Sequence, residues 1–131
     1  MFTKEMITAS QAKVQSGADY PRLVQELKAM GIRSYVHFVA DGSNVFHGDG
    51  GHAVTVSHVQ ETILVADRAS EDLLRRSLSI HQQGKTDYPT FCREAGEAGV
   101  AAWTSDLEAM TVTYSDLTNK PILVEPIPRP K

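Results

Sequence analysis

The feature that most constrains the fold of this chain is a stretch of sequence that occurs twice, at a constant offset of 68 residues. The segment from Asp19 to Gly31 shares five residues in thirteen positions with the segment from Asp87 to Gly99, and no gap is needed to align them. Two copies of about 65 residues are too few for a solenoid, yet an internal repeat constrains a fold more than any single motif. We therefore expect one domain built from two halves related by a pseudo-twofold axis.

Each copy of the repeated stretch predicts a helix that ends at glycine and leads into strands. Asp19 and Asp87 are helix-capping residue types, and the proline two positions later falls in the first helical turn, where a missing N–H costs nothing. Glycine tolerates the left-handed conformation that ends many helices, so Gly31 and Gly99 are the expected stops. The residues that follow are rich in β-branched and aromatic side chains in alternation, which indicates half-buried strands.

The same signals along the whole chain predict an α+β fold over residues 1–131. An antiparallel sheet of about six strands should carry helices on one face, because each helix shows a single apolar stripe. The expected repeat units are 4–57 and 70–125, and an extended proline-rich tail follows at 126–131. Residues 59–66 fit either a short strand or a buried connector. The expected helices cover 4–15, 19–30, 67 or 70 to 82, and 87–98; the expected strands cover 32–40, 44–47, 53–57, 100–103, 110–114 and 122–125.

Composition narrows the classes of protein to consider. The chain has 131 residues, of which 41% are hydrophobic and 22% charged, values typical of one globular domain. A net charge of −3 with interspersed signs disfavours nucleic-acid binding. No apolar run approaches the ~18 residues of a membrane span, and the N-terminal segment is too charged for a signal peptide. A single cysteine excludes an intramolecular disulfide and fits a reducing compartment, so we expect a cytoplasmic protein without a membrane partner.

Several short stretches of the second half form a recognisable pattern. They are His81–Gly84, Thr86–Cys92, Ala98–Val100, Trp103, Met110–Thr111, Thr113–Tyr114 and Val124–Pro128. With these stretches the chain resembles the YdfO-like family, small proteins of unknown function from enteric bacteria and their prophages. The resemblance implies an α+β domain of this length, and it implies neither an activity nor functional residues.

The first candidate site is a metal site at a hairpin end. His47 and His52 flank Gly48–Gly51 and could face each other across the turn. With Asp49 they would supply two imidazoles and one carboxylate, a donor set that suits several divalent metals. The alternative is a polar hairpin end, since the spacing matches no compact ligand motif.

The second candidate is a thiol cluster of His81, Cys92 and Asp106. A nucleophilic cysteine needs a nearby base, and Cys92 lies in the first turns of a predicted helix, a position that favours a thiolate. The alternative is a small buried side chain, because the matching residue in the other copy is Val24.

Two further pairs are matched by the repeat. Glu26 and Glu94 could meet near the pseudo-twofold axis as acid and base, or they could be exposed helix residues. Tyr35 and Trp103 could stack a ligand, or they could anchor the two halves of the core, which we favour.

No sequence signature of catalysis or of a cofactor is present, so two functions stay open. The first is a non-enzymatic protein-interaction module, which uses its sheet face or edge strands to bind another protein or itself. The alternative is a small hydrolase or metal-dependent enzyme that uses histidine and carboxylate residues. A cleft that gathers either cluster would favour the alternative.

Overall fold

The computed structural model describes residues 1–15, 17–57 and 61–128. Helices and strands follow one another as two helices, three strands, two helices and three strands, with two short 3-10 turns in the first half. The elements are α1 (Lys4–Gln11), η1 (Gly17–Asp19), α2 (Tyr20–Ala29), β1 (Ser34–Phe38), β2 (Asn44–His47), η2 (Asp49–Gly51), β3 (Ala53–Val56), α3 (Glu71–Gln82), α4 (Tyr88–Glu97), β4 (Ala102–Asp106), β5 (Thr111–Ser115) and β6 (Pro121–Pro126).

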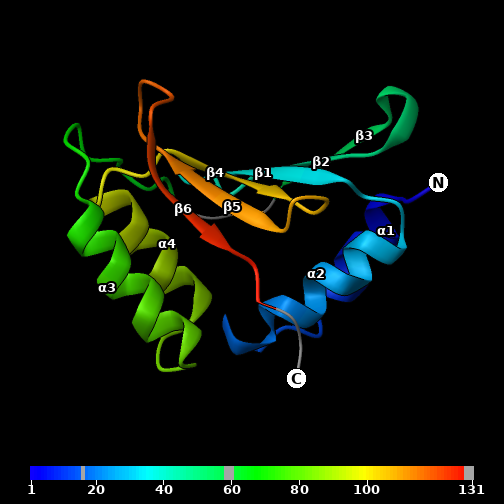
Figure 1. Ribbon diagram of the computed structural model, residues 1–131, viewed down its shortest axis with the longest axis horizontal. Helices are drawn as coiled ribbons and strands as arrows, with labels where there is room; N and C mark the ends of the chain where they lie inside the picture. The colour runs from blue at the N-terminus through cyan, green and yellow to red at the C-terminus, as the bar shows by residue number, and fades with distance from the viewer. Residues whose placement is uncertain (16, 58–60, 129–131) are drawn as a thin grey trace.

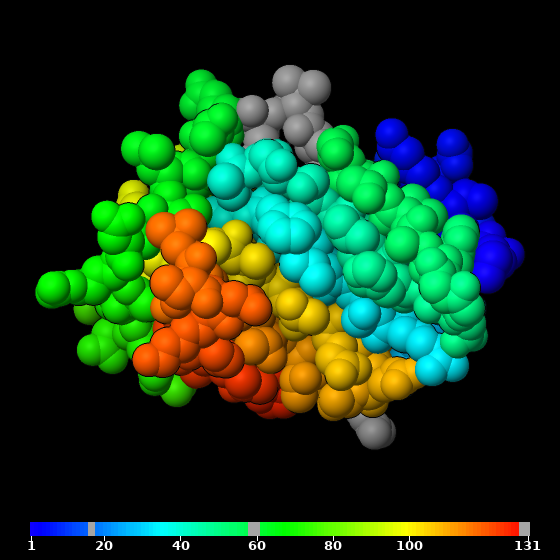
Figure 2. Space-filling view, turned by 90° about the horizontal axis from the view of Figure 1, so that it is seen from above, coloured from blue at the N-terminus to red at the C-terminus, as the bar shows by residue number. Residues whose placement is uncertain are grey.

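The six strands form one antiparallel sheet in the order β3-β2-β1-β4-β5-β6. The two helix pairs, α1 with α2 and α3 with α4, stand apart on the same face of this sheet (Figure 1). The predicted α+β fold, with an antiparallel six-stranded sheet and helices on one face, is confirmed. In the described part of the chain no α-helix covers the opposite face of the sheet, and Figure 2 looks onto that face from above.

The strand register repeats between the two halves. Tyr35 of β1 pairs with Phe46 of β2, and Trp103 of β4 pairs with Tyr114 of β5, each residue 68 positions after its counterpart. The two halves join through β1 and β4, whose register places Val36 opposite Thr104, again residues 68 apart. The outermost pair, β5 with β6, departs from this pattern at a register shift next to Tyr114.

The helix pairs are held by matched hydrogen bonds. In the first pair the Ser10 hydroxyl donates to Glu26 Oε1 at 2.9 Å, and in the second the Ser77 hydroxyl donates to Glu94 Oε1 at 3.0 Å. Serine, two turns into the first helix, thus contacts glutamate in the middle of the second helix both times. We propose that the two halves descend from one duplicated unit; these contacts and the repeated register support that proposal.

Asp19 and Asp87 are both at the N-cap position of their helices, as predicted, but only one of them caps its helix through the side chain. The Asp87 side chain caps α4 by accepting from Thr90 N at 2.8 Å. Asp19 makes no side-chain cap on α2, because the 3-10 turn before it directs its carboxylate back to Gln15 N, at 2.9 Å. The two matched aspartates therefore have different roles. Asp87 bonds forward to the first turn of its helix, whereas Asp19 bonds back to the segment before its helix.

Some boundaries also differ from the prediction. α1 ends at Gln11 rather than residue 15. β4 begins at Ala102 rather than residue 100, because Val100 N donates to Ala95 O and is still part of the end of α4. Within the uncertain 59–66 segment, residues 59–60 lie outside the described residues. Residues 61–66 form neither helix nor strand, and Ile63 N and Ala66 N bond to Ala40 O and Gly96 O.

The core lies between the sheet and the helix pairs. Tyr35, His37 and Val39 of the first half face it as the alternation predicts, and so do Val112 and Tyr114 of the second. The exposed apolar side chains Phe38 and Val124 are at the other parity of their strands, on the open face. Among the described helices, none combines the length and the hydropathy that a membrane crossing requires.

Candidate binding cleft

A cleft of about 1520 Å³ lies between the two helix pairs, with the sheet as its floor. Both halves of the chain line it. All four tyrosines and the only tryptophan of the chain are among the lining residues, although they are spread over α2, β1, α4, β4 and β5. The aromatic lining residues are Tyr20, Tyr35, Phe46, Tyr88, Phe91, Trp103 and Tyr114.

A row of three hydrogen-bonded hydroxyls links α2 to the sheet. The Tyr20 hydroxyl lies 2.8 Å from Ser105 Oγ, and the Tyr35 hydroxyl donates to the Tyr20 hydroxyl at 3.0 Å. These residues come from α2, β1 and β4, so the row ties both halves together. Burial raises the pKa values of Tyr20 and Tyr35, and both hydroxyls therefore stay protonated over the physiological range.

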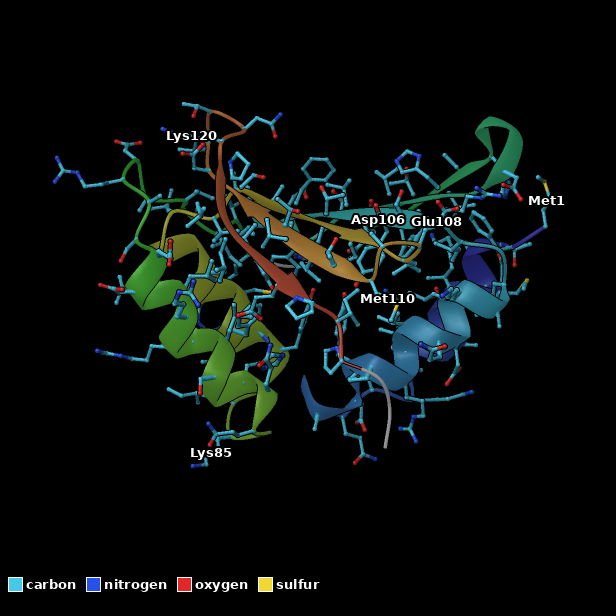
Figure 3. The ribbon with its side chains drawn as sticks, viewed as in Figure 1. Met1, Lys85, Asp106, Glu108, Met110 and Lys120 are labelled. Carbon is cyan, nitrogen blue, oxygen red and sulfur yellow. The ribbon has the colours of Figure 1, made fainter. Side chains whose placement is uncertain are left out.

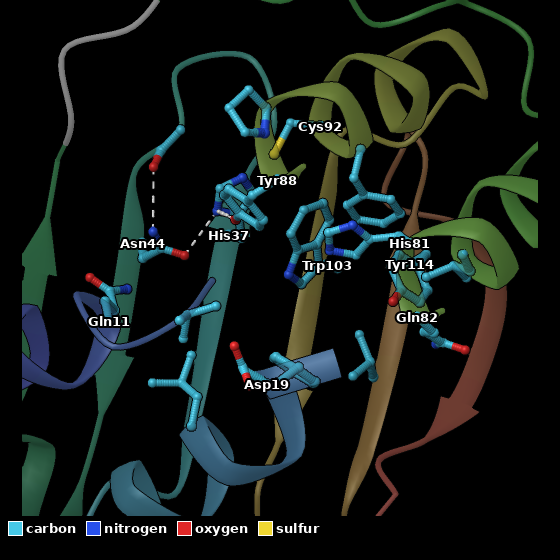
Figure 4. Close-up of a pocket in the computed structure, with 18 of the residues that line it drawn as sticks. Gln11, Asp19, His37, Asn44, His81, Gln82, Tyr88, Cys92, Trp103 and Tyr114 are labelled. Atoms are coloured by element: carbon cyan, nitrogen blue, oxygen red, sulfur yellow. Dashed lines mark hydrogen bonds between the residues drawn. The ribbon is translucent and has the colours of Figure 1, made fainter. Parts of the chain in front are cut away.

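A second polar group is built around His37, which is 2% exposed. Its Nδ1 lies 2.9 Å from Asn44 Oδ1, and Asn44 Nδ2 donates to Gly42 O (Figure 4). The Tyr88 hydroxyl, which comes from the other half, lies 3.3 Å from the same His37 nitrogen. Residues from both halves thus meet at Nδ1 of the imidazole.

Two stacked ring pairs form the wall beside these groups. His37 stacks on Trp103 with ring centroids 4.2 Å apart and planes 17° apart. His81 stacks on Phe91 at 4.6 Å and 14°. Trp103 also touches Phe91 and Tyr114, with centroids 5.6 and 5.9 Å apart. Aromatic rings thus make a continuous surface from β1 to α3.

The cleft buries no carboxylate, ammonium or guanidinium group. Within the described ranges, the buried polar side chains are serine, asparagine and histidine, and no Asp, Glu, Lys or Arg is buried. Burial raises the pKa of Tyr114, raises the pKa of the Cys92 thiol to about 11, and lowers the pKa of His81. Each of these groups is therefore uncharged at neutral pH. The charged lining residues stand at more exposed positions, and they are Asp19, Arg22, Glu61, Arg93, Glu97 and Glu125.

Comparison with known proteins places the chain in a family. Residues 8–126 match the model of a protein of unknown function, DUF1398. The chain belongs to this family. A search of the curated proteins finds no match for it. The DUF1398 family assignment supplies no activity.

The predicted metal residues of this DUF1398 chain are engaged elsewhere. Asp49 forms an ion pair with Arg33, and His52 Nε2 lies 2.9 Å from the carbonyl oxygen of Phe2. His47 is exposed at the end of β2. In the parts of the chain that the structure describes, no group of three metal-ligating side chains is arranged to hold an ion.

The predicted thiol cluster is only partly gathered. His81 and Cys92 both line the cleft, on α3 and α4. Asp106 lies at the turn between β4 and β5, where its Oδ1 accepts from Glu108 N and Ala109 N at 3.0 Å. Figure 3 shows Asp106 beside Glu108, nearer to the α1–α2 pair than to α3–α4. The thiol therefore lacks the predicted carboxylate in the DUF1398 fold.

The predicted carboxylate pair is separated in the same way, since Glu26 and Glu94 are each bonded within their own helix pair. Sequence reasoning did select Tyr35 and Trp103, and both line the cleft of the DUF1398 chain. It missed the buried polar residues His37, Asn44 and Ser105, of which His37 and Asn44 line the cleft. Their signal was present, because each lies on the inward-facing parity of a strand otherwise filled by large apolar residues.

Proposed function

We propose that this DUF1398 protein is a non-enzymatic binding module, and that the cleft between its helix pairs holds a small organic molecule. The observation that carries the proposal is the gathering of every tyrosine and the one tryptophan around a single cleft. Ligand pockets are concave, mainly apolar and aromatic, with a few polar groups that fix orientation. The hydroxyl row at Tyr20 and the imidazole of His37 supply those polar groups.

The cleft chemistry supports binding over catalysis. General acid–base catalysis needs a group whose pKa lies near the working pH, and a cysteine nucleophile needs a thiolate. Cys92 has its pKa raised by burial, and Asp106, its predicted partner, is held at a distant turn. The alternative, a small hydrolase or metal enzyme, would need an activated group that these contacts do not provide.

We also propose the biological setting that the family resemblance implies, a small accessory protein of the YdfO-like kind in the cytoplasm of a bacterium or its prophage. A protein partner or a second copy of the chain remains a proposal for the open sheet face. Phe38 and Val124 are the large apolar side chains exposed there, at 42% and 55%. The edge strand β6 is bracketed by Pro121 and Pro126, which lack the N–H needed to extend a sheet.

A binding experiment with defined probes tests the proposed function. Trp103 is the only tryptophan, so its indole N–H gives one assignable resonance in a ¹⁵N-correlated spectrum. We expect a naphthalene-sized probe such as 2-acetonaphthone to shift this resonance saturably. The variant Phe38→Ala, which removes an apolar side chain from the open face, should bind it equally well. A probe series that leaves the Trp103 resonance in place, or binding that Phe38→Ala abolishes, would overturn the proposal.

A further inference from the structure

Two polar groups that border the cleft make no hydrogen bond to the described part of the chain. They are the indole N–H of Trp103 and the hydroxyl of Tyr114, on side chains that are each 6% exposed. An indole nitrogen can only donate, and a group open to the cleft can donate to whatever occupies it. Both residues line the cleft, so a molecule there could satisfy them.

The two groups lie next to each other. Trp103 and Tyr114 are directly paired across β4 and β5, and their ring centroids are 5.9 Å apart. Figure 4 shows the indole nitrogen and the hydroxyl oxygen on the same side of the sheet, both directed toward the open part of the cleft. Acceptors on one small molecule could therefore meet both groups.

The matching positions in the other half do not show this feature. Tyr35, which corresponds to Trp103, has its hydroxyl bonded to Tyr20. Phe46, which corresponds to Tyr114, has no polar group. The unsatisfied pair is therefore specific to the second half, and it is not a general consequence of the fold. This difference locates the polar end of a ligand against β4 and β5.

The surroundings define the rest of the ligand. Parallel ring pairs, His37 on Trp103 and His81 on Phe91, present flat surfaces that favour a flat partner. The charged side chains that line the cleft are partly or fully exposed, and none is buried in the described residues. A charged molecule seated against the buried rings would therefore lose its hydration without gaining a buried counter-charge.

We infer that the cleft takes an uncharged, flat aromatic molecule whose carbonyl or ring-nitrogen acceptor receives hydrogen bonds from Trp103 Nε1 and the Tyr114 hydroxyl. This inference rests on the proposed function and specifies the chemical class of its ligand. It distinguishes the molecule both from anions, such as aromatic acids, and from aromatic cations.

Four probes of one shape separate these properties. 2-Acetonaphthone is neutral with an acceptor; 2-isopropenylnaphthalene replaces the carbonyl by a carbon–carbon double bond; 2-naphthoate is an anion; 2-naphthylmethylammonium is a cation. Each is titrated against the full chain, with the Trp103 indole resonance as readout. We expect the ketone to bind at least about fivefold more tightly than the other three, the worth of about one hydrogen bond.

A variant assigns the effect to the donor. Tyr114→Phe should weaken the ketone about fivefold and leave the alkene unchanged, since it removes only the hydroxyl. The control Thr113→Val removes a hydroxyl of the same strand at the parity opposite to Tyr114, outside the cleft lining, and it should leave the ratio of ketone to alkene affinity as in the wild type. Urea unfolding of both variants verifies that they are folded at the assay temperature.

The outcomes distinguish the two proposals. If none of the probes shifts the Trp103 resonance, the cleft is not a binding site, and the proposed function and this inference both fail. If probes bind but the anion or cation equals the ketone, the cleft stands and the ligand class is wrong. An alkene as tight as the ketone, or a Tyr114→Phe variant without effect, would likewise reject the hydrogen-bonded acceptor alone.

Discussion

The reactivity of Cys92 offers a quantitative test of the claim that the cleft is not catalytic. Burial raises the pKa of this thiol to about 11, so at pH 8 about 0.1% is thiolate. An unperturbed cysteine, with a pKa of about 8.5, is about 24% thiolate at that pH. The population of the reactive form thus falls about 240-fold.

The higher pKa also makes the remaining thiolate a better nucleophile. For thiol–disulfide exchange a Brønsted coefficient of about 0.4–0.5 over 2.5 pKa units returns a factor of roughly 10–18. The net expectation is a reaction about 20-fold slower than that of an unperturbed thiol, before steric protection is added. Cys92 is 3% exposed, so access slows it further.

The assay is the rate of reaction with 5,5′-dithiobis(2-nitrobenzoate), measured on the folded chain and on the chain unfolded in guanidinium chloride at the same pH. We expect the folded rate to be at least about 20-fold lower, and to keep rising with pH above 9. A folded rate that equals or exceeds the unfolded one, or that levels off below pH 8, would mean an activated cysteine. The enzymatic alternative would then regain its support.

Three further predictions concern stability. A Cβ at Gly99 would lie 2.7 Å from the backbone of the connector before α3, whereas one at Gly31 meets nothing within 4 Å, although both residues have positive φ. Gly31→Ala should therefore lower the unfolding free energy by about 1–2 kcal/mol, and Gly99→Ala should lower it by at least about 2 kcal/mol more. Urea titrations measure both values, and equal losses would contradict the close approach at Gly99. Tyr35→Phe should cost about 1 kcal/mol because it breaks a bonded hydroxyl, while Tyr114→Phe should change stability by less than about 0.5 kcal/mol, and the reverse order would refute our assignment of the unbonded hydroxyl. Burial lowers the pKa of His81, so the unfolded chain binds a proton there more readily, and stability should fall as pH drops below about 6.5. His81→Gln should flatten that part of the profile of melting temperature against pH. A profile that His81→Gln leaves unchanged would contradict this role of His81.

The fold could be predicted because its signals are local. Alternation around Tyr35 and His37 gave the inward face of β1, and the two glycine stops gave the helix ends. The missing side-chain cap at Asp19 could not be predicted. The hydrogen bond that its carboxylate accepts from Gln15 N instead depends on a 3-10 turn that no sequence motif indicates. The predicted start of β4 at Val100 was wrong for a similar reason. Val100, the residue after Gly99, still donates its N–H to Ala95 O at the end of α4.

The cleft could be predicted only in part. The repeat pointed to Tyr35 and Trp103, although it favoured a role in the core over ligand stacking. No sequence pattern indicates that the two helix pairs stand apart, and the cleft lies between them. The hydrogen bonds that build the polar groups of the cleft join residues far apart in the sequence. Tyr20 reaches Ser105, 85 residues away, and Tyr88 reaches His37, 51 residues away. Such contacts follow from the pairing of β1 with β4, which sequence alone left open.

The most direct test of the central claim is the position of a bound probe. Intermolecular nuclear Overhauser effects between 2-acetonaphthone and the full chain should connect the naphthalene ring to the ring protons of Trp103 and Tyr114. The account predicts these contacts inside the cleft, with none to Phe38 or Val124. Contacts confined to Phe38 and Val124 on the open sheet face would contradict it.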